Sequence, residues 1–303
     1  MAILKNKLAY LYVVLGASLW GIIGIFIREL SDAGFTSLQI VTLRVVSAAL
    51  MLVIFLLCTN PRKLIIQTRD IPVFIGTGIL SIVFFNWCYF TAIREVSLSV
   101  AVMLLYTGPA FVIILSRIFF NEYFNLPKIS ALILTVLGCM LVIQLFPLSE
   151  KVISFYGLLV GLGSGFGYAL YSIFGKIALR RYTTITIISY TFIFASLILI
   201  PTSGLTINFD LLTSPITVAN IVGLGLFPTV LAYLLYTIGL SMIESGKASI
   251  TATMEPVVAT AVGVYIFDEI LTAFQLVGII LIISSVVILQ LRNKPKKTVA
   301  RAS

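Results

Sequence analysis

The feature that most constrains this chain is a series of apolar stretches, each about 20 residues long. Ten candidate spans can be placed, at residues 8–27, 36–58, 71–93, 98–119, 127–146, 154–176, 184–201, 217–240, 248–267 and 274–291. A helix needs about 20 apolar residues to cross the hydrocarbon core of a bilayer, and in lipid only helices and closed barrels satisfy the backbone. Because the chain is 60% hydrophobic and 10% charged, it is predicted to be an all-α integral membrane protein with ten transmembrane helices.

The distribution of basic residues predicts how these spans are oriented. With the N-terminus placed in the cytoplasm, 15 of the 20 Lys and Arg residues fall in cytoplasmic segments and 3 fall outside, while Arg44 and Arg117 lie within spans. Positive charge concentrates on the cytoplasmic side of membrane proteins. We therefore expect a multi-pass protein of the cell inner membrane with both termini in the cytoplasm.

The same rule accounts for the net charge of +9 without a nucleic-acid partner. Residues 292–303 contain five Lys or Arg residues. We expect them to form a basic cytoplasmic tail, and such a tail can contact anionic lipid of the bilayer.

Residue types that are absent or isolated exclude several kinds of chemistry. The chain has no histidine, which excludes histidine-based metal sites, Ser-His-Asp triads and histidine proton relays. Its three cysteines, Cys58, Cys88 and Cys139, are isolated in apolar segments, and this argues against a metal cluster or a disulfide framework. No nucleotide-binding motif occurs. We therefore expect no metal, no cofactor and no enzymatic activity.

An internal repeat divides the chain into two halves. Residues 89–122 align without gaps to residues 236–269 at a constant offset of 147, which pairs Pro109 with Pro256. The predicted five-helix repeats are 1–147 and 152–291. Because five is an odd number, the two repeats must lie in opposite orientations. Inverted repeats of this kind place a binding site near the membrane midplane, between the halves.

Glu255 and Pro256 lie near the middle of the ninth span. A carboxylate at that depth costs roughly 2.5 kcal/mol or more, and a proline leaves the carbonyl of Ala252, four residues earlier, without its helical partner. Nearby hydroxyls such as that of Thr253 can satisfy freed backbone groups. Since Pro109 has the matching position in the fourth span, we expect two discontinuous helices that line a substrate path. Two ordinary proline kinks are the alternative.

Three roles are open for Glu255. It can carry a proton or bind a cationic group, because an ionisable residue inside a membrane marks a substrate or proton path. It can instead form a buried ion pair with Arg44, the only basic residue deep in the second span. It can also simply face water.

Aromatic residues near mid-depth, Trp20, Tyr106 and Tyr168, can form a cavity wall that stacks on organic substrates or cations. Each of them singly also suits ordinary packing or an interfacial belt. Glu122 and Glu269 stand at span ends. We expect these two carboxylates to set helix ends or to pair with nearby bases.

Several short segments together resemble a known family. They are Leu19-Trp20-Gly21, Leu43-Arg44, Ala92-Ile93, Ser97-Leu98, Pro109 and Asn121-Glu122 in the first half, and Gly239-Leu240, Ala248, Glu255-Pro256, Phe267-Asp268-Glu269 and Gln275-Leu276-Val277-Gly278 in the second. In their order and duplication they resemble the ten-helix EamA-type members of the drug/metabolite transporter superfamily, over nearly the full length of the chain. Within that superfamily the chain is most similar to amino-acid and aromatic-metabolite exporters.

The resemblance implies two inverted five-helix repeats around a central cavity, with the fifth and tenth spans at the periphery. It also implies a set of substrate-binding positions, namely Trp20, Asn86, Tyr89, Tyr106, Tyr168, Thr253 and Glu255. The implied function is a secondary transporter, expected to be an exporter, of small organic metabolites such as amino acids, working by alternating access. A multidrug or organic-cation exporter is the alternative. A non-transporting membrane sensor or assembly protein is the hypothesis from another class.

One position departs from the symmetry of the repeats. Gly108 occupies in the first repeat the place that Glu255 has in the second, so the mid-membrane charge is present on one side only. A proton can therefore be the coupling ion only if Glu255 carries it. The sequence leaves open the substrate, the direction of transport, the coupling and the oligomeric state.

Overall fold

The computed structural model describes residues 2–145, 154–204 and 214–291. This part of the chain is helical and contains no strand. Nine of its helical segments are long and apolar enough to cross a membrane, and one shorter apolar helix accompanies them. All ten predicted spans are therefore helical, which confirms the fold class. The repeat boundaries remain predictions, because their junction and the basic tail, 292–303, lie outside the described residues.

The first half contains α1 (Ala2–Gly21), α2 (Ile23–Asp32), α3 (Ser37–Thr59), η1 (Pro61–Leu64), η2 (Thr68–Asp70), α4 (Ile71–Ile75), η3 (Gly76–Val83), α5 (Phe84–Glu95), α6 (Leu98–Leu105), α7 (Gly108–Phe120) and α8 (Leu126–Val142). The second half contains α9 (Phe155–Ala178), α10 (Thr184–Thr202), α11 (Pro215–Gly225), η6 (Leu226–Leu231), α12 (Ala232–Met242), α13 (Ser245–Ala252), α14 (Met254–Ile266) and α15 (Ala273–Leu291). The first span thus continues to Asp32 as two helices, and the third and eighth spans each contain a π-helical segment, η3 and η6.

The two halves repeat each other in backbone detail. Helices α6 and α13 have the same length and begin 147 residues apart. Asn121 and Asp268, also 147 residues apart, both adopt a left-handed backbone with φ of 55° at the ends of matching helices. Asn and Asp tolerate this conformation better than most residues. The offset seen in the sequence is therefore the offset of the structural repeat.

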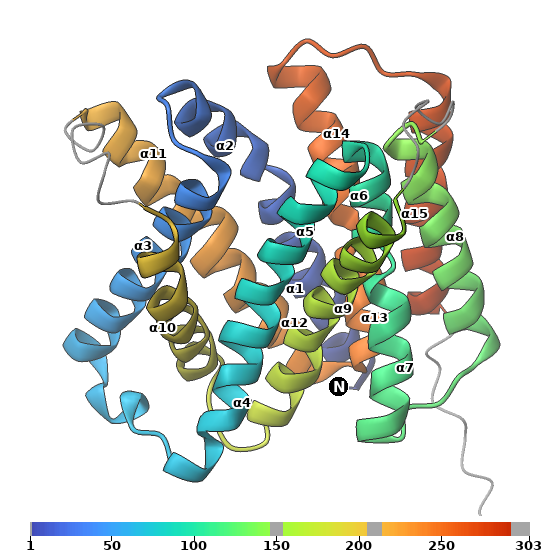
Figure 1. The fold of residues 1–303 in the computed structure, drawn as a ribbon. Coiled ribbons are helices and arrows are strands. Elements are labelled where there is room, and N and C mark those ends of the chain that lie inside the picture. Colours follow the sequence, from blue (N-terminus) through green and yellow to red (C-terminus); the bar gives the residue numbers. More distant parts are fainter. Residues whose placement is uncertain (1, 146–153, 205–213, 292–303) are drawn as a thin grey trace, which may run out of the picture.

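The helices that surround the centre form two groups, and each group mixes the two halves (Figure 1). In group A, α1 of the first half packs against α12, α13 and α14 of the second. In group B, α9 of the second half packs against α5, α6 and α7 of the first. The first helix of each repeat therefore packs with helices of the other repeat, and the centre of the molecule lies between the groups.

The remaining long helices lie outside these groups. Helix α3 packs against α10 and α11, and α8 packs against α15. The α8–α15 contact is close because glycines face each other: a Cβ atom added to Gly138 would lie 2.8 Å from the carbonyl oxygen of Gly278. The hydroxyl of Thr135 donates to Ser285 Oγ across the same contact, at 2.9 Å. Small residues and interhelical hydrogen bonds are typical of helix pairs in membranes.

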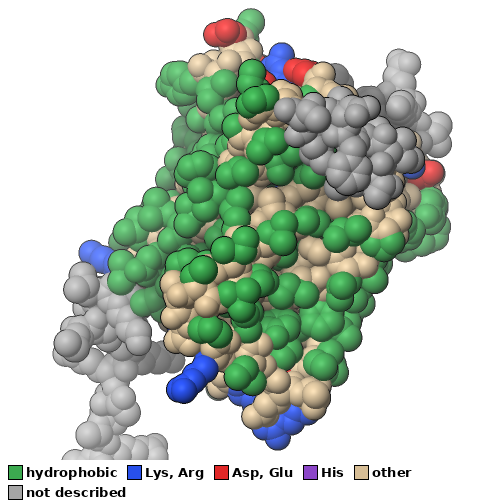
Figure 2. Space-filling model, turned by 90° about the vertical axis from the view of Figure 1, so that its left-hand side faces the viewer, with side chains coloured by type: hydrophobic (Ala, Val, Ile, Leu, Met, Phe, Trp, Pro, Cys, Tyr) green, Lys and Arg blue, Asp and Glu red, His purple; other side chains and the backbone are tan. Residues whose placement is uncertain are grey.

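The surface of the molecule suits a bilayer. Figure 2 shows a broad hydrophobic face with charged side chains gathered towards the two ends. Large apolar side chains such as Leu50, Ile54, Ile133 and Ile280 are more than half exposed. In water such a surface would drive association, whereas in lipid it is the expected outer face of a helical membrane protein.

Candidate substrate cavity

A cavity of about 90 Å³ lies between groups A and B. One water molecule needs roughly 10–15 Å³ on this measure, so the space suits a small solute. The cavity is lined by Trp20, Ile23, Arg44, Ser81, Ile82, Phe85, Leu105, Tyr106, Pro109, Tyr168, Tyr171, Ser172, Tyr233, Tyr236, Ala252, Thr253 and Glu255. Both repeats contribute to its wall.

Two helix interruptions meet at this cavity. Helix α6 ends at Leu105 and α7 begins at Gly108, while α13 ends at Ala252 and α14 begins at Met254. The linking residues Tyr106 and Thr253 have nearly the same backbone angles, with φ of −72° and −70° and ψ of 4° and 5°. Both residues line the cavity. At these two places the non-helical backbone at membrane depth faces a cavity inside the protein, where such backbone is tolerated.

The physical cause of each interruption is the proline that follows it. Pro109 and Pro256 carry no N–H group and cannot donate to the carbonyl four residues earlier. The hydroxyl of Thr253 donates to the carbonyl oxygen of Ile250 at 2.6 Å, and that of Thr107 donates to Leu104 in the same way at 2.6 Å. The same two carbonyl oxygens also accept the backbone N–H groups of Thr253 and Thr107, each at 3.2 Å, so side chain and backbone together close the ends of α13 and α6.

Glu255 and Arg44 are the charged residues of the cavity wall. Arg44 donates to Thr229 Oγ1 at 2.9 Å and to the carbonyl oxygen of Pro228 at 3.3 Å, and its guanidinium lies 5.9 Å from the ring centre of Tyr233. Within the described residues, the carboxylate of Glu255 has no hydrogen-bond or ion-pair partner. The two charges therefore share the cavity without forming the ion pair that the sequence left open.

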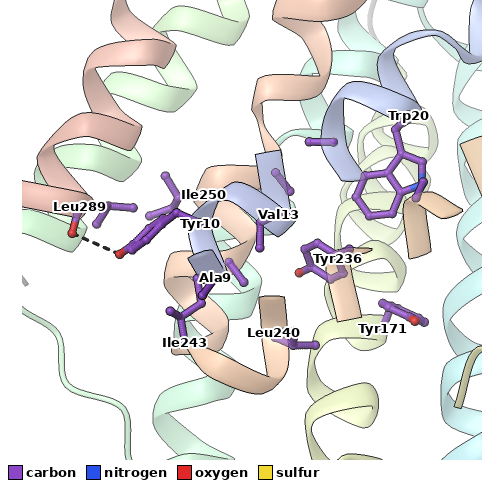
Figure 3. Packing of buried hydrophobic residues seen from close by; sticks show 14 of the residues in the cluster. Ala9, Tyr10, Val13, Trp20, Tyr171, Tyr236, Leu240, Ile243, Ile250 and Leu289 are labelled. Atoms are coloured by element: carbon purple, nitrogen blue, oxygen red, sulfur yellow. Dashed lines mark hydrogen bonds between the residues drawn. The ribbon is translucent and has the colours of Figure 1, made fainter. Parts of the chain in front are cut away.

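Aromatic rings make up much of the remaining wall. Trp20 lies between Tyr233 and Tyr236, with ring centres 5.1 and 5.2 Å away, and Tyr171 meets Tyr233 edge to face at 4.9 Å. Figure 3 shows Trp20, Tyr236 and Tyr171 beside one another. Edge-to-face packing of this kind is favourable between aromatic rings. The rings come from α1, α9 and α12, so they join both helix groups.

The polar atoms of these rings are not equally satisfied. The hydroxyl of Tyr171 hydrogen-bonds to Thr237 Oγ1 at 2.7 Å, and that of Tyr236 hydrogen-bonds to Ser172 Oγ at 2.6 Å. Trp20 is only 7% exposed, yet its Nε1 has no hydrogen-bond partner in the described part of the chain. A buried donor without a partner costs about 1–3 kcal/mol, and this one belongs to a residue of the cavity wall.

The structure brings together most of the predicted site. Trp20, Tyr106, Tyr168, Thr253 and Glu255 all line the cavity, as does Pro109. Pro256 follows Glu255 and is buried, but it is not part of the wall.

For Asn86 and Tyr89 the structure differs from the expectation, because neither lines the cavity. The amide nitrogen of Asn86 donates to the carbonyl oxygen of Ile82 at 2.7 Å, so this buried side chain is satisfied within its own helix. The ring of Tyr89 stacks on Phe85 at 5.9 Å and packs against the buried side chains around Val96. Phe85, one helical turn before Tyr89, lines the cavity instead.

Other residues of the wall were not proposed as binding residues from the sequence: Ser81, Phe85, Tyr171, Ser172, Tyr233 and Tyr236. Helical spacing could have predicted some of these residues. Tyr171 follows Tyr168 by three residues, and Tyr236 follows Tyr233 by three. Residues three apart lie on the same face of a helix, so a helix face that contains one wall residue predicts the next.

Comparison with known proteins agrees with this arrangement. The sequence profile of the EamA-like transporter family matches residues 7–144 and again residues 155–291. The chain belongs to the EamA-like transporter family. The two matches correspond to the two structural repeats, so the EamA-like resemblance seen in the sequence motifs is confirmed, and the protein is a transporter.

Two of the curated relatives span nearly the whole chain, and a third spans about two thirds of it. An uncharacterized transporter of Archaeoglobus fulgidus is 29% identical over 91% of this chain and 94% of its own length. The uncharacterized inner membrane transporter YicL of Salmonella typhimurium is 22% identical over 98% and 99%. The pseudopaline exporter CntI of Pseudomonas aeruginosa is 28% identical over 64% of this chain and 66% of its own.

A protein of known crystal structure has the same fold. It superimposes with a TM-score of 0.73 over 96% of both chains, at 16% sequence identity. At this identity the likeness concerns the arrangement of the helices and not the solute.

Proposed function

We propose that this EamA-like protein is a secondary transporter that exports small zwitterionic metabolites such as amino acids by alternating access. The observation that carries the proposal is the pairing of opposite charges in one aromatic cavity: the unpartnered carboxylate of Glu255, and the guanidinium of Arg44. A solute that carries both an ammonium and a carboxylate group complements the two.

The aromatic wall and the unpartnered indole of Trp20 support the same class of solute. The indole N–H can donate to a carboxylate or carbonyl oxygen of the solute. Rings such as those of Tyr106 and Tyr168 can stack on an organic side chain or attract its cationic group. One relative is named as an exporter, of pseudopaline, and this supports the outward direction proposed here.

An organic-cation exporter is the second candidate, and the position of Arg44 separates it from the first. A cation would use Glu255 and the rings, and it would gain nothing from Arg44. In the zwitterion proposal, Arg44 contributes directly to binding.

The membrane orientation proposed here follows the basic residues. Arg62, Arg69, Arg180 and Arg181 belong to connections at the end where the N-terminus lies, at the bottom of Figure 1, and Lys128 lies in the first turn of α8 at the same end. Their number supports a cytoplasmic location for that end and for both termini.

Counterflow into proteoliposomes tests the proposal. Vesicles loaded with an unlabelled amino acid should accumulate the same labelled amino acid, whereas empty vesicles and vesicles without protein should not. A panel of amino acids, aromatic metabolites and quaternary ammonium ions identifies the class. Accumulation of the ammonium ions alone would replace the first candidate with the second, and binding of a solute without any accumulation would favour a sensor.

A further inference from the structure

The two ends of the bundle are packed differently, although the repeats have the same helices. The lower end is the end where the N-terminus lies in Figure 1, and the upper end is opposite. At the lower end α13 of group A packs against α7 and α9 of group B. The symmetry of the repeats predicts that α6 packs against α14 and α1 at the upper end, yet in the described structure α6 makes no comparable contact with either.

Burial of the matching helices reflects this difference. All eight residues of α13 are buried. In α6, which lies 147 residues earlier, only Val100, Ala101 and Leu104 are buried. Below the cavity the two groups are thus in close contact, whereas above it α6 makes no comparable contact with group A helices α14 and α1 in the described part of the chain.

The N-terminus of α13 is held by the other repeat. The carboxylate of Glu122, which follows α7, accepts hydrogen bonds from the backbone N–H groups of Ser245 at 2.7 Å and Gly246 at 3.3 Å. Glu244, at the N-cap position of α13, makes no capping hydrogen bond itself. The first N–H groups of a helix need acceptors and attract negative charge, so Glu122 acts as a cap supplied from group B.

A buried lysine strengthens this contact. Lys128 is 1% exposed, and its Nζ lies 3.4 Å from Glu122 and 2.7 Å from Glu244. Lys247 lies 3.3 Å from the other oxygen of Glu244. Lys128 therefore ties the segment after α7 to the segment before α13. Removing one partner from a buried ion pair leaves an uncompensated charge and is strongly unfavourable.

Near this contact a second lysine links group A to group B. Nζ of Lys176 on α9 donates to the carbonyl oxygens of Leu240 and Ile243 at the end of α12. Burial tends to raise the pKa of Glu244, but the hydrogen bond and the charge of Lys128, together with Lys247, outweigh it and hold the pKa of Glu244 below its usual value. The carboxylate is therefore charged, as the ion pairs require.

The matching positions at the upper end lack these ion pairs. At an offset of 147, Glu122 corresponds to Glu269, Lys128 to Gln275 and Glu244 to Ser97. Ser97 caps its own helix, accepting from the N–H of Val100 at 3.3 Å. The carboxylate of Glu269 is exposed and has no hydrogen-bond or ion-pair partner in the described part of the chain.

We propose that Glu122, Lys128 and Glu244 form a polar lock that closes the cavity at the lower end, and that in the opposite state Glu269 caps α6 in the place where Glu122 caps α13. The proposal rests on the transport function proposed above. Because the upper end has Gln275 and Ser97 where the lock has charges, closure at the lower end is favoured, and the upper-closed state is the less populated one.

Spin-label distance measurements on the full chain in lipid nanodiscs test the lock. Labels at Leu98 and Tyr265, both exposed, report the separation of α6 and α14 at the upper end, and labels at Phe119 and Ser241 report that of α7 and α12 at the lower end. The exposed Cys58 is changed to Ser first.

Lys128→Gln with Glu244→Ser gives the lower end the residues of the upper end. We expect the lower distance to lengthen and the upper one to shorten, with the ratio of the two states changing about tenfold, which corresponds to about 1.4 kcal/mol. Gln275→Lys with Ser97→Glu should shift the distances in the same direction by strengthening the upper contact. This second variant keeps the lock intact, so it tests the proposal even if the first variant folds poorly.

Asp70→Asn is the matched control. It breaks an ion pair with Arg181 of 2.7 Å, also at the lower end, but this pair joins segments next to α4 and α9, and α4 packs directly against α9 of group B. Its distances should equal those of the wild type. Unchanged distances in both folded lock variants would overturn the lock. The distance measurement uses no solute, so its result does not depend on which solute is transported. If counterflow fails but the distances shift as expected, the proposed solute transport is wrong and the lock is supported.

Discussion

Arg44 and Glu255 face one cavity without forming an ion pair, and the guanidinium of Arg44 is held by hydrogen bonds to Thr229 and Pro228. Removing charges from water is costly unless each one is paired. A carboxylate that is left without a partner beside a fixed cation is therefore available to a ligand. This relationship predicts that the two residues act on different groups of the same solute.

Changing Glu255→Gln should weaken transport of every solute that carries an ammonium group. Loss of a charge-assisted hydrogen bond costs about 1.5–3 kcal/mol, which corresponds to roughly a 10- to 100-fold rise in the half-saturation concentration in counterflow. Glu29→Gln changes an exposed glutamate outside the cavity and is the control. Equal transport by Glu255→Gln and wild type would exclude a role for this carboxylate in binding.

Changing Arg44→Gln should separate zwitterions from simple cations. Counterflow of an amino acid should fall about 10-fold or more, because a charge-assisted contact with its carboxylate is lost. Counterflow of a quaternary ammonium ion should be unaffected or should rise. Thr229→Val serves as the comparison, since it removes one hydrogen bond of Arg44 and keeps its charge. Equal losses for both classes of solute would mean that Arg44 only supports the fold.

Trp20→Phe should remove a hydrogen bond to the solute while keeping the aromatic packing. We expect the affinity for amino acids to fall by about fivefold, the effect of one neutral hydrogen bond. The chain has two tryptophans, and Trp87 is 54% exposed. In Trp87→Phe, the fluorescence of Trp20 should therefore respond to a bound solute. A solute that is transported but leaves this fluorescence unchanged would contradict contact with Trp20.

The lock predicts a dependence of the lower-end distance on pH. The pKa of Glu244 is held below its usual value in the closed state. Glu244 therefore stabilises this state fully when the pH is above about 4.3, the pKa of a glutamate that has been released from the lock. This stabilisation is lost as the pH falls through the lower pKa of the closed state. Glu122, Lys128, Lys247 and Lys176 are the charged groups around it. We expect a constant distance between pH 8 and about pH 5 and an increase at lower pH, which Glu244→Gln should remove.

The sequence was sufficient for the helical fold, the repeat and the prolines that interrupt its helices, because these depend on local signals. Apolar runs of the right length, a constant offset and Pro109 with Pro256 can be read without knowing any contact. Trp20 and Glu255 were predicted for the site because both are unusual residue types at membrane depth, and both line the cavity.

The residues facing the cavity were harder to predict, because the repeats are equivalent in sequence but not in packing. Tyr89 and Tyr236 occupy matching positions, yet Tyr236 lines the cavity and Tyr89 packs against Phe85. No local pattern in the sequence distinguishes these two tyrosines, because their surroundings depend on contacts between distant helices. The contact between Lys128 and Glu244 joins residues far apart in the chain, and it became visible only in three dimensions.

The contact between α8 and α15 gives a prediction about stability. A Cβ atom added to Gly138 would lie 2.8 Å from a backbone oxygen of Gly278, and backbone cannot rotate away as a side chain can. Gly138→Ala should therefore push the helices apart and destabilise the protein by about 1–3 kcal/mol. Gly24→Ala is the matched control, because an added Cβ there meets nothing within 4 Å and alanine favours a helix by about 1 kcal/mol over glycine. In thermal unfolding in detergent, Gly138→Ala should melt below the wild type and Gly24→Ala at or above it. If Gly138→Ala melts with the control, α8 and α15 are not in the close contact described.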